Sequence, residues 1–380
     1  MYVDFSSSKA DVGILADPDA SANVDRTARA TAWIGALKVR TVGRFDAFAA
    51  PGGGEVQLAQ TTAALRSVGV DARCWRPWDD EPSRDVDLLH LFGSRREFLP
   101  LVEAARKQGT RVALSTIAWF DWRNAWREPT GLMKRSMAAA RYGLRAAFPR
   151  IPSWRRRLYD AADVLLPNSQ AEAEQLIRLF RVPATKIRVV PNGFDARFAH
   201  GDAELFARRF GLRDFVLCIG RIEPRKNQLG LIRALRGSGR TLVVLGDVVP
   251  GQEAYAATCR AAADADVHFL SAIRHDDPLL ASAYAACRCL ALIGWYETPG
   301  LAALEAAATG TPLVLPRGGC ADEYFGPHAE YVTPDDIPRI RAAVFAASER
   351  ERSAELARLV AATFTWKQVA EATKAAYDLQ

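Results

Sequence analysis

From Lys38 onward, short apolar runs of strand length alternate with longer segments in which apolar and polar positions recur with a helical period. This alternation is typical of a parallel sheet whose strands are joined by crossover helices. The apolar runs predict strands at residues 38–48, 71–74, 88–91, 111–116, 164–168, 215–219, 240–245, 267–270, 289–293 and 312–315. The amphipathic segments predict helices at residues 56–68, 99–108, 133–145, 170–180, 227–236, 252–263, 277–285, 300–309 and 336–347.

The turn signal Pro191-Asn192-Gly193 divides this pattern into two series of similar length. A chain of 380 residues is also too long for one ordinary domain. We therefore expect an α/β fold with two Rossmann-like parallel-sheet domains that face each other across a cleft, where the carboxyl ends of both sheets bind ligands. The expected parts are an N-terminal extension (1–35, with a short helix near 25–37), the two domains (36–198 and 199–363) and an amphipathic C-terminal helix (364–380) that returns to the first domain.

Composition indicates the charge of the partner and the compartment of the protein, but it does not identify the partner. The formal net charge of +6 and the pI near 9.1 favour an anionic partner, with nucleic acid, anionic lipid and a phosphorylated substrate all open on charge alone. The six cysteines form no Cys-x-x-Cys pair or Cys/His cluster, and no run of transmembrane length or signal-peptide pattern occurs. We expect a reduced, cytoplasmic protein.

The segment from Leu290 to Gly310 combines an apolar run, a short turn and an Ala/Leu-rich helix. Thr298 is a suitable N-cap and Pro299 a suitable first helical residue. The unpaired amides near Gly300 and Leu301 would then face the carboxyl end of the sheet, with the helix dipole behind them. Such a helix start is an anion site.

Two carboxylates, Glu297 and Glu305, bracket this helix start. Because carboxylates repel phosphate, hydroxyl groups are their natural partners. The pattern therefore predicts a sugar nucleotide, with its diphosphate on the amides, one glutamate on the ribose and the other on the transferred sugar. A strand, turn and helix with two glutamates is also common in α/β proteins, so this element alone leaves a purely structural interpretation open.

A second element follows the apolar run at 215–219. Gly220 permits a tight backbone turn, and Arg221 and Lys226 follow on the next loop. One forked and one compact cation suit the oxygens of a diphosphate. The alternative is that both cations pair with Glu223 and Asp214 at the surface.

A third element is the run Gly52-Gly53-Gly54, between the first expected strand and the first expected helix. Consecutive glycines at such a junction allow close approach of a phosphate or a sugar to the backbone. The spacing is not Gly-x-Gly-x-x-Gly, which disfavours a dinucleotide site.

Together, these segments resemble the retaining nucleotide-sugar glycosyltransferases of family 4, which have the GT-B fold. The resemblance covers roughly residues 38–380, and its most specific part is a Glu-x7-Glu signature preceded by an Arg…Lys segment. The segments that carry it are Gly52–Gly54, Leu166–Ser169, Val189–Asp195, Gly220–Asn227, Glu297–Glu305, Gly318–Gly326 and Phe364–Trp366.

The resemblance implies a role for each matching residue. Arg221 and Lys226 would hold the donor diphosphate and stabilise the leaving nucleotide, while Glu297 would contact the sugar at the reacting face. It implies no metal or other cofactor, because cations and a helix dipole do this work. The further implied residues are Glu305, Gly300, Leu301, Thr298 and Gly220 for the donor, and Gly53 and Gly54 for the acceptor and phosphate side.

The chain departs from the family pattern in one place. Many relatives carry a histidine after the fourth strand of the first domain, whereas this chain has Trp119, Phe120 and Asp121 there. Asp121 is our candidate for a polar group on the acceptor side. His90, one strand earlier, is better explained as a hydrogen-bonded strand residue than as a ligand.

Residues 132–158 interleave arginines and lysine with apolar and aromatic side chains. This pattern suits a helix on an anionic membrane surface, and a solvated basic helix face explains it equally well. A lipid-linked acceptor would make membrane docking useful, at the inner face of the plasma membrane.

We therefore expect a hexosyltransferase that uses a nucleotide diphosphate sugar and a glycan or polyprenyl-diphosphate-linked acceptor, in envelope polysaccharide biosynthesis. Nothing in the sequence fixes the base; GDP-mannose and UDP-glucose both fit. The alternatives are a non-catalytic sugar-nucleotide-binding paralogue and a GT-B-like nucleotide-sugar epimerase. A nucleic-acid-binding module is disfavoured, because it would have no use for Glu297 and Glu305.

Overall fold

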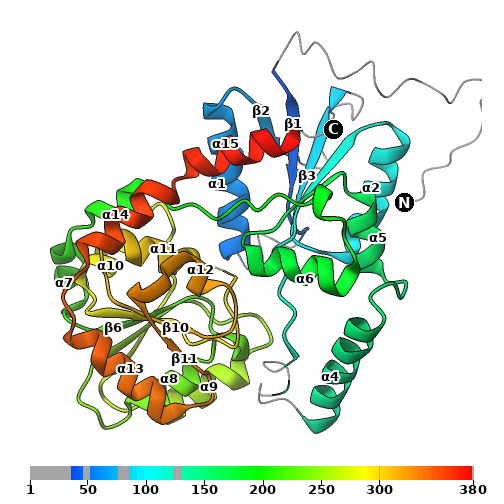
Figure 1. Ribbon diagram of the computed structural model, residues 1–380. Coiled ribbons are helices and arrows are strands. Elements are labelled where there is room, and N and C mark those ends of the chain that lie inside the picture. The colour runs from blue at the N-terminus through cyan, green and yellow to red at the C-terminus, as the bar shows by residue number, and fades with distance from the viewer. Residues whose placement is uncertain are drawn as a thin grey trace, which may run out of the picture. The chain divides into compact units, whose positions relative to one another are not determined.

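The computed structural model describes residues 36–45, 52–75, 85–122, 126, 131–298 and 300–378. The N-terminal extension and nearly all of the helix expected near residues 25–37 lie outside these ranges. Within them, two parallel sheets alternate with helices along the chain (Figure 1).

The first sheet has five strands in the order β2-β1-β3-β4-β5, and every neighbouring pair is parallel. Its strands are mostly buried, as expected for a sheet covered by helices on both faces. Their bounds are β1 Lys38–Val42, β2 Asp71–Cys74, β3 Leu88–Phe92, β4 Arg111–Ser115 and β5 Val164–Leu166.

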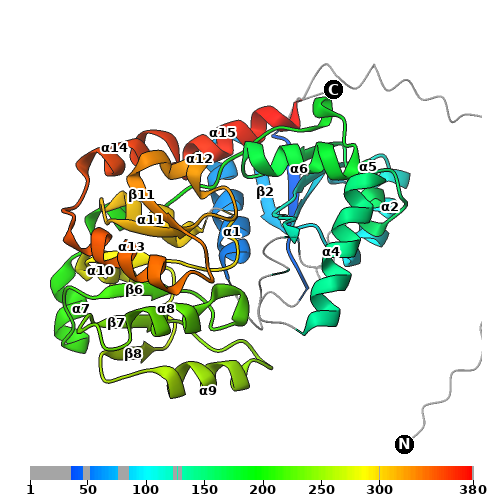
Figure 2. The ribbon, with the colours of Figure 1, turned by 60° about the horizontal axis from the view of Figure 1, so that its bottom comes forward.

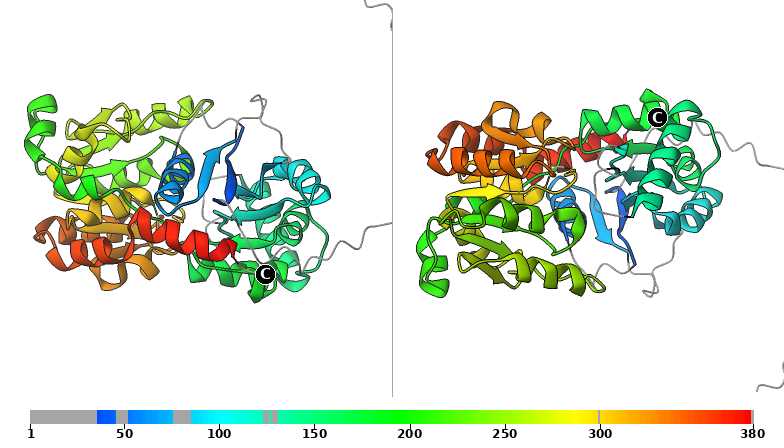
Figure 3. Two further views of the ribbon diagram at one scale, coloured as in Figure 1. Left: turned by 90° about the horizontal axis from the view of Figure 1, so that it is seen from above. Right: turned by 90° about the horizontal axis from the view of Figure 1, so that it is seen from below.

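Alternate residues of these strands enter two separate cores, one on each face of the sheet. The ribbon shows helices on both sides of the sheet (Figure 3). Leu89 and Leu91 pack with helices α2 (Leu99–Lys107), α5 (Trp154–Ala161) and α6 (Gln170–Phe180) on one face. On the other face, Leu88 packs with helices α1 (Gly53–Ser67) and α15 (Trp366–Tyr377).

The second sheet has six strands in the order β11-β10-β9-β6-β7-β8, and every neighbouring pair is again parallel. One core contains helices α7, α10, α11 and α14, and the other contains α8, α9 and α13. The strands are β6 Val216–Ile219, β7 Leu242–Leu245, β8 Val267–Leu270, β9 Cys289–Ala291, β10 Leu313–Pro316 and β11 Ala329–Val332. The helices are α7 Ala203–Phe210, α8 Gln228–Leu235, α9 Glu253–Ala262, α10 Pro278–Ala286, α11 Leu301–Ala308, α12 Ala321–Phe325, α13 Ile337–Glu349 and α14 Ala354–Thr363.

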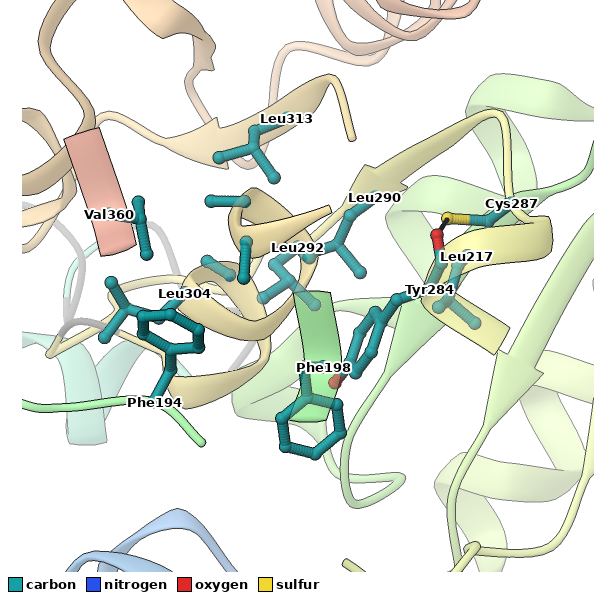
Figure 4. Close-up of a cluster of buried hydrophobic side chains, with 14 of the residues drawn as sticks. Phe194, Phe198, Leu217, Tyr284, Cys287, Leu290, Leu292, Leu304, Leu313 and Val360 are labelled. Atoms are coloured by element: carbon teal, nitrogen blue, oxygen red, sulfur yellow. Dashed lines mark hydrogen bonds between the residues drawn. The ribbon is translucent and has the colours of Figure 1, made fainter. Parts of the chain in front are cut away.

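Helix α11 is buried along almost its whole length, and it carries a glutamate into the interior. Leu304 packs among apolar side chains that include Leu292 and Leu290 (Figure 4). Seven of the eight residues of α11 are buried, Glu305 among them. Packing of the apolar residues of α11 therefore holds the Glu305 carboxylate in the interior, where burial of an unpaired charge is unfavourable.

Helix α15 packs against α1 and contributes to the core of the first sheet. Val369 and Ala370 belong to the same buried cluster as Val39 of β1. At its far end, the Tyr377 hydroxyl lies 2.6 Å from Nδ1 of His90 on β3. The C-terminal segment thus completes a core that the N-terminal segment begins.

Some elements differ from those that the sequence predicts. The expected strand 38–48 ends at Val42, and Arg44 beyond it pairs with Glu55, while residues 46–48 lie outside the described ranges. The edge strand β11 was missed, since its four residues include the polar Glu330 and form no continuous apolar run. Helices α5, α7, α12 and α14 were missed as well.

Candidate functional site

The loop after β6 brings two cations to the carboxyl end of the second sheet. Gly220 takes a φ of +133°, which side chains rarely permit, and its amide donates to the Leu245 carbonyl of β7 at 3.0 Å. Gly246 lies so close that a Cβ there would meet the Gly220 carbonyl oxygen at 2.1 Å. This close contact between Gly220 and Gly246 turns the chain at the end of β6, and Arg221 and Lys226 follow in the loop.

Lys226 forms an ion pair with Glu297, from the loop after β9. Its Nζ lies 2.5 Å from Glu297 Oε1, and the side chains are only 17% and 6% exposed. The two loops are also joined by the Trp295 amide, which donates to the Arg225 carbonyl at 2.9 Å. The alternative, a surface pair between Lys226 and Glu223 or Asp214, is therefore not found among the described residues.

For Arg221, the alternative of pairing with Glu223 is partly correct, because its guanidinium lies 3.5 Å from the Glu223 carboxylate. It also faces the glycine run of the first sheet. A Cβ added to Gly52 would lie 3.5 Å from the Arg221 guanidinium, and one on Gly53 would lie 3.9 Å from Leu301. Apart from its chain neighbours and its own helix backbone, no described atom lies within 4 Å of a Cβ added to Gly54. The structure thus brings Gly52 and Gly53 close to Arg221 and the start of α11.

The expectation that Thr298 caps α11 was wrong. Gly300 is the N-cap, with φ −60° and ψ 121°, and the helix begins at Leu301. Glu297 lies in the turn before this cap: its Oε2 would be 3.4 Å from a Cβ on Gly300, and it is bound to Lys226. The turn holds this carboxylate, and the helix begins after it. Pro299 lies outside the described residues.

Because Gly300 has no side chain, no side-chain oxygen of the N-cap occupies the first amides of α11. The first turn of a helix has amides without intrahelical partners. The start of α11 therefore keeps the capacity to bind an anion that the sequence predicted, in the backbone around Gly300 and Leu301.

Glu305 is held by two residues that the sequence analysis missed. Tyr284 of α10 donates its hydroxyl to Glu305 Oε2 at 2.6 Å, and His275 Nε2 lies 3.0 Å from Glu305 Oε1. Burial and this carboxylate raise the pKa of Tyr284 well above its ordinary value, so Tyr284 stays a donor.

Arg197 fixes the tautomer of His275. Its guanidinium lies 3.0 Å from His275 Nδ1 and also donates to the His275 carbonyl. Since arginine only donates, Nδ1 must accept and Nε2 must carry the hydrogen that points to Glu305. His275 follows β8, so its place at the carboxyl end of a strand was the available signal.

The loop after β4, where many relatives carry a histidine, is held by Glu172 of α6. This carboxylate accepts from the Thr116 hydroxyl at 2.5 Å and from the Ala118 amide at 2.7 Å. Between them, Ile117 has a φ of 42°, an unusual value for a β-branched residue. Burial raises the pKa of Glu172 to about 7.

Asp121 lies beyond this loop, in a cavity of about 470 Å³ that Trp295 and Tyr296 also line. The structure thus places it beside residues that immediately precede Glu297. His90 is instead fully buried, with its Nε2 2.9 Å from the Ser115 hydroxyl, and burial lowers its pKa to about 3. The interpretation of His90 as a satisfied strand histidine is confirmed.

In the ranges that the structure covers, no group of three or more histidine, cysteine or carboxylate side chains could hold a metal ion. A search of the same ranges for a helix long and apolar enough to cross a membrane also found none.

Comparison with known families covers both sheets. A model described as Glycosyltransferase Family 4 matches residues 51–198, and one described as Glycosyl transferases group 1 matches residues 213–348. The chain belongs to glycosyltransferase family 4. The first matched range contains Gly53, and the second contains Arg221, Lys226, Glu297 and Glu305.

Curated relatives within this family have named activities. A D-inositol 3-phosphate glycosyltransferase from Stackebrandtia nassauensis is 33% identical over 244 residues, which are 57% of this chain and 54% of the relative. An MMP alpha-(1->4)-mannosyltransferase from Mycolicibacterium hassiacum is 29% identical over 320 residues, covering 77% and 71%. The chain spans about half the length of the inositol phosphate relatives it matches.

Solved structures agree on the GT-B fold. A sucrose-phosphate synthase from Thermosynechococcus elongatus matches with a TM-score of 0.70 at 18% identity, over 90% of this chain and 98% of that one. Anabaena HepE, solved in complex with UDP and glucose, matches with a TM-score of 0.68 at 17% identity, over 90% and 100%.

Proposed function

We propose that this family 4 protein is a retaining hexosyltransferase. It transfers a hexose from a nucleotide diphosphate sugar to a hydroxyl group of a glycan or a polyprenyl-diphosphate-linked acceptor, in envelope polysaccharide biosynthesis. The family assignment, the named relatives and a structural neighbour that binds UDP and glucose support this proposal.

The observation that carries the proposal is the contact between Lys226 and Glu297. A cation suited to phosphate and a carboxylate suited to sugar hydroxyls meet at 2.5 Å beside the free amides of α11. In our proposal, the diphosphate draws Lys226 and Arg221 to its oxygens, and Glu297 is released to accept from the hydroxyls of the sugar. Glu305 accepts from the ribose with the lone pairs that His275 and Tyr284 leave free.

We also propose that transfer requires no metal. Negative charge grows on the leaving nucleotide, and preorganised donors aimed at such charge can supply the stabilisation that a metal ion supplies elsewhere. Here these donors are the Arg221 guanidinium, the Lys226 ammonium and the amides at Gly300 and Leu301.

Activity assays distinguish two alternatives from the proposed transferase. A non-catalytic paralogue would bind a sugar nucleotide without turnover, and an epimerase would change the sugar without releasing it to an acceptor. The deciding experiment is a screen of nucleotide sugars for donor hydrolysis and for transfer to extracted glycolipids. Release of nucleotide from one donor, lost in Glu297→Gln, supports transfer; absence of turnover and binding for every donor refutes it.

Helix α4 (Leu132–Ala147) favours a second proposal, that the protein docks on an anionic membrane. None of its described residues is buried, and it extends away from the first sheet (Figures 1 and 2). It carries four cations and no acid. Exposed apolar side chains stand among them, namely Leu132, Met133, Met137 and Leu144, with Phe148 just beyond the helix.

Such a face suits the headgroup layer of a bilayer, where apolar side chains enter the lipid and cations meet its phosphates. Flotation with anionic liposomes tests it. We expect recovery with vesicles to fall when Lys134, Arg135 and Arg141 are changed to glutamate. Unchanged recovery, or equal recovery with neutral vesicles, contradicts the docking proposal. This proposal places the protein at the inner face of the plasma membrane.

A further inference from the structure

Four segments of the chain contribute no side chain to the donor site, yet the structure brings all four together around helix α12. This helix follows β10 of the second sheet. The contacts join the first half of the protein, which is the first sheet with its helices, to the second half, which is the second sheet with its helices. The four segments are Leu166–Ser169, Val189–Asp195, Gly318–Gly326 and Phe364–Trp366.

Tyr324 of α12 lies at the centre of these contacts and is buried. Its hydroxyl donates to the Asn168 carbonyl at 2.6 Å and accepts from the Asn192 amide at 3.0 Å. Its ring stacks on Phe364, with 4.7 Å between the ring centroids. Asn168 follows β5 of the first sheet, while Asn192 and Phe364 lie where the chain crosses from one sheet to the other. One side chain therefore contacts the first half and both crossings.

The two crossings are also bound to each other. The Phe194 amide donates to the Phe364 carbonyl at 2.8 Å. A Cβ added to Gly193 would lie 2.8 Å from the ring of Trp366, so the backbone of one crossing packs directly on a side chain of the other. The crossings and Tyr324 thus form one packed junction between the halves.

Glu323, the residue before Tyr324, binds the start of helix α6 in the first half. Its Oε2 accepts from the Gln170 amide and its Oε1 from the Ala171 amide, both at 2.7 Å. The first amides of a helix have no intrahelical partner, and negative charge is favoured beside them. Ser169, the N-cap of α6, accepts only from the next amide, that of Glu172. A carboxylate of the second half therefore completes the cap of a helix in the first.

Helix α12 is connected in the other direction to Glu297 of the donor site. The Glu297 amide donates to the Gly318 carbonyl, and the Cys320 amide donates to the Glu297 carbonyl, both at 3.3 Å. Between them, Gly319 has a φ of +114°, and a Cβ there would lie 2.0 Å from the Glu297 carbonyl oxygen. The backbone of Glu297 is thus held by the loop that leads directly into α12 and to Glu323.

Helix α6 in turn holds the loop after β4, which leads to Asp121. Glu172 accepts from the Ala118 amide, and the Gln175 side-chain oxygen accepts from the Phe120 amide at 2.7 Å. Printed contacts therefore connect the carboxylate expected to contact the donor sugar with the loop expected on the acceptor side. Glu323 is the point at which this series of contacts passes from one half to the other.

We propose that Glu323 is a positioning residue for transfer. By binding the first two amides of α6, it sets the loop that precedes Asp121 at a fixed distance from Glu297, so that an acceptor hydroxyl meets the donor sugar. The inference rests on the proposed function, because it takes these two loops as the acceptor and donor sides of one reaction. Glu323 itself contacts neither substrate.

Distances between spin labels on the two halves test the contact in the full chain. One label is attached to Cys74 of β2, the exposed cysteine, since the other five are buried. The second is attached to an Arg208→Cys variant, at an exposed position of α7 in the second half. We expect a narrow distance distribution that Glu323→Ala broadens. Glu323→Gln should be intermediate, because glutamine has one acceptor oxygen where glutamate has two.

Asp322→Asn is the matched control, because Asp322 is the neighbouring exposed carboxylate of the same helix. Its distance distribution should equal that of the unchanged residue. Circular dichroism checks that each variant is folded. A Glu323→Ala distribution as narrow as that of the control overturns the proposal.

Kinetics then separate positioning from a general loss of structure. With UDP-glucose and GDP-mannose as donors, Glu323→Ala should lower the kcat of transfer to extracted glycolipids by up to roughly a hundredfold, the cost of a misplacement of about 1 Å. Donor hydrolysis by water and the affinities for UDP and GDP should stay within twofold, since the donor site lies in the second half. A parallel fall in transfer, hydrolysis and nucleotide affinity overturns the positioning role.

The distance measurement does not depend on turnover. Distances that broaden in Glu323→Ala, without hydrolysis or transfer of any donor, would retain the contact between the halves and refute the transferase. Normal transfer by Glu323→Ala would retain the transferase and refute the positioning role.

Discussion

From the ion pair between Lys226 and Glu297 we predict that the effects of substituting these two residues on nucleotide affinity are not additive. Without substrate, Lys226 is bound to Glu297 with 17% and 6% of the two side chains exposed. A diphosphate must compete for this ammonium. Lys226→Ala therefore removes one charged hydrogen bond to the nucleotide, and it leaves the Glu297 carboxylate unpaired and repelling the phosphate.

A charged hydrogen bond contributes about 1.5–3 kcal/mol, and each 1.4 kcal/mol is tenfold in affinity. We expect Lys226→Ala to weaken nucleoside diphosphate binding by roughly tenfold to a hundredfold. Glu297→Gln should leave binding unchanged or make it slightly tighter, because it frees Lys226, while it abolishes transfer. The double variant should bind tighter than Lys226→Ala alone, because the repelling charge is gone.

Isothermal titration with the nucleoside diphosphate that gives the largest thermal shift measures all four dissociation constants. The control is Lys367→Ala, which breaks an exposed lysine–glutamate pair elsewhere on the surface and should change nothing. If Lys226→Ala binds within twofold of the unchanged protein, or if the double variant is no tighter than Lys226→Ala, the geometry does not act as we describe.

Further expectations concern ribose recognition, metal ions and pH. His275→Phe should weaken nucleoside diphosphate binding by about tenfold, the lower end of the range for a hydrogen bond to a charged group, because Glu305 loses the partner that holds it for the ribose. Pyrophosphate binding should not weaken, and parallel loss for both ligands in titrations would contradict the action of His275 through Glu305. Exhaustive EDTA treatment should leave the turnover rate unchanged, and recovery of lost activity by added Mg²⁺ would refute metal independence. Burial raises the pKa of Glu172 from 4.5 to about 7, so the folded protein holds this proton more tightly than the unfolded chain. The contribution of Glu172 to stability should therefore be complete below pH 4.5 and be lost as the pH rises to about 7. Melting temperatures measured against pH should lose this part of their slope in Glu172→Gln, and an unchanged slope would contradict the assignment.

Much of the fold followed from local pattern. Strand β8 and helix α6 have the bounds that the sequence predicts, and in α6 the apolar positions coincide with the buried face. The meeting of Lys226 with Glu297 was also predictable, since both follow strands of one parallel sheet and such ends share an edge.

What the sequence could not provide depends on contacts between distant segments. The start of α11 lies at Gly300 rather than Thr298, after a turn whose Glu297 is bound to Lys226, 71 residues away in the chain. The tautomer of His275 depends on Arg197, 78 residues away in the chain.

The last helix has a consequence for how the protein is made. Val369, Ala370 and Tyr377 fill a core that starts with Val39, so the first sheet keeps an open apolar face until α15 has been synthesised. A nascent chain that stalls before α15 emerges from the ribosome would expose this face and become a substrate for chaperones. The first sheet therefore completes its core only after the whole of the second sheet has been synthesised.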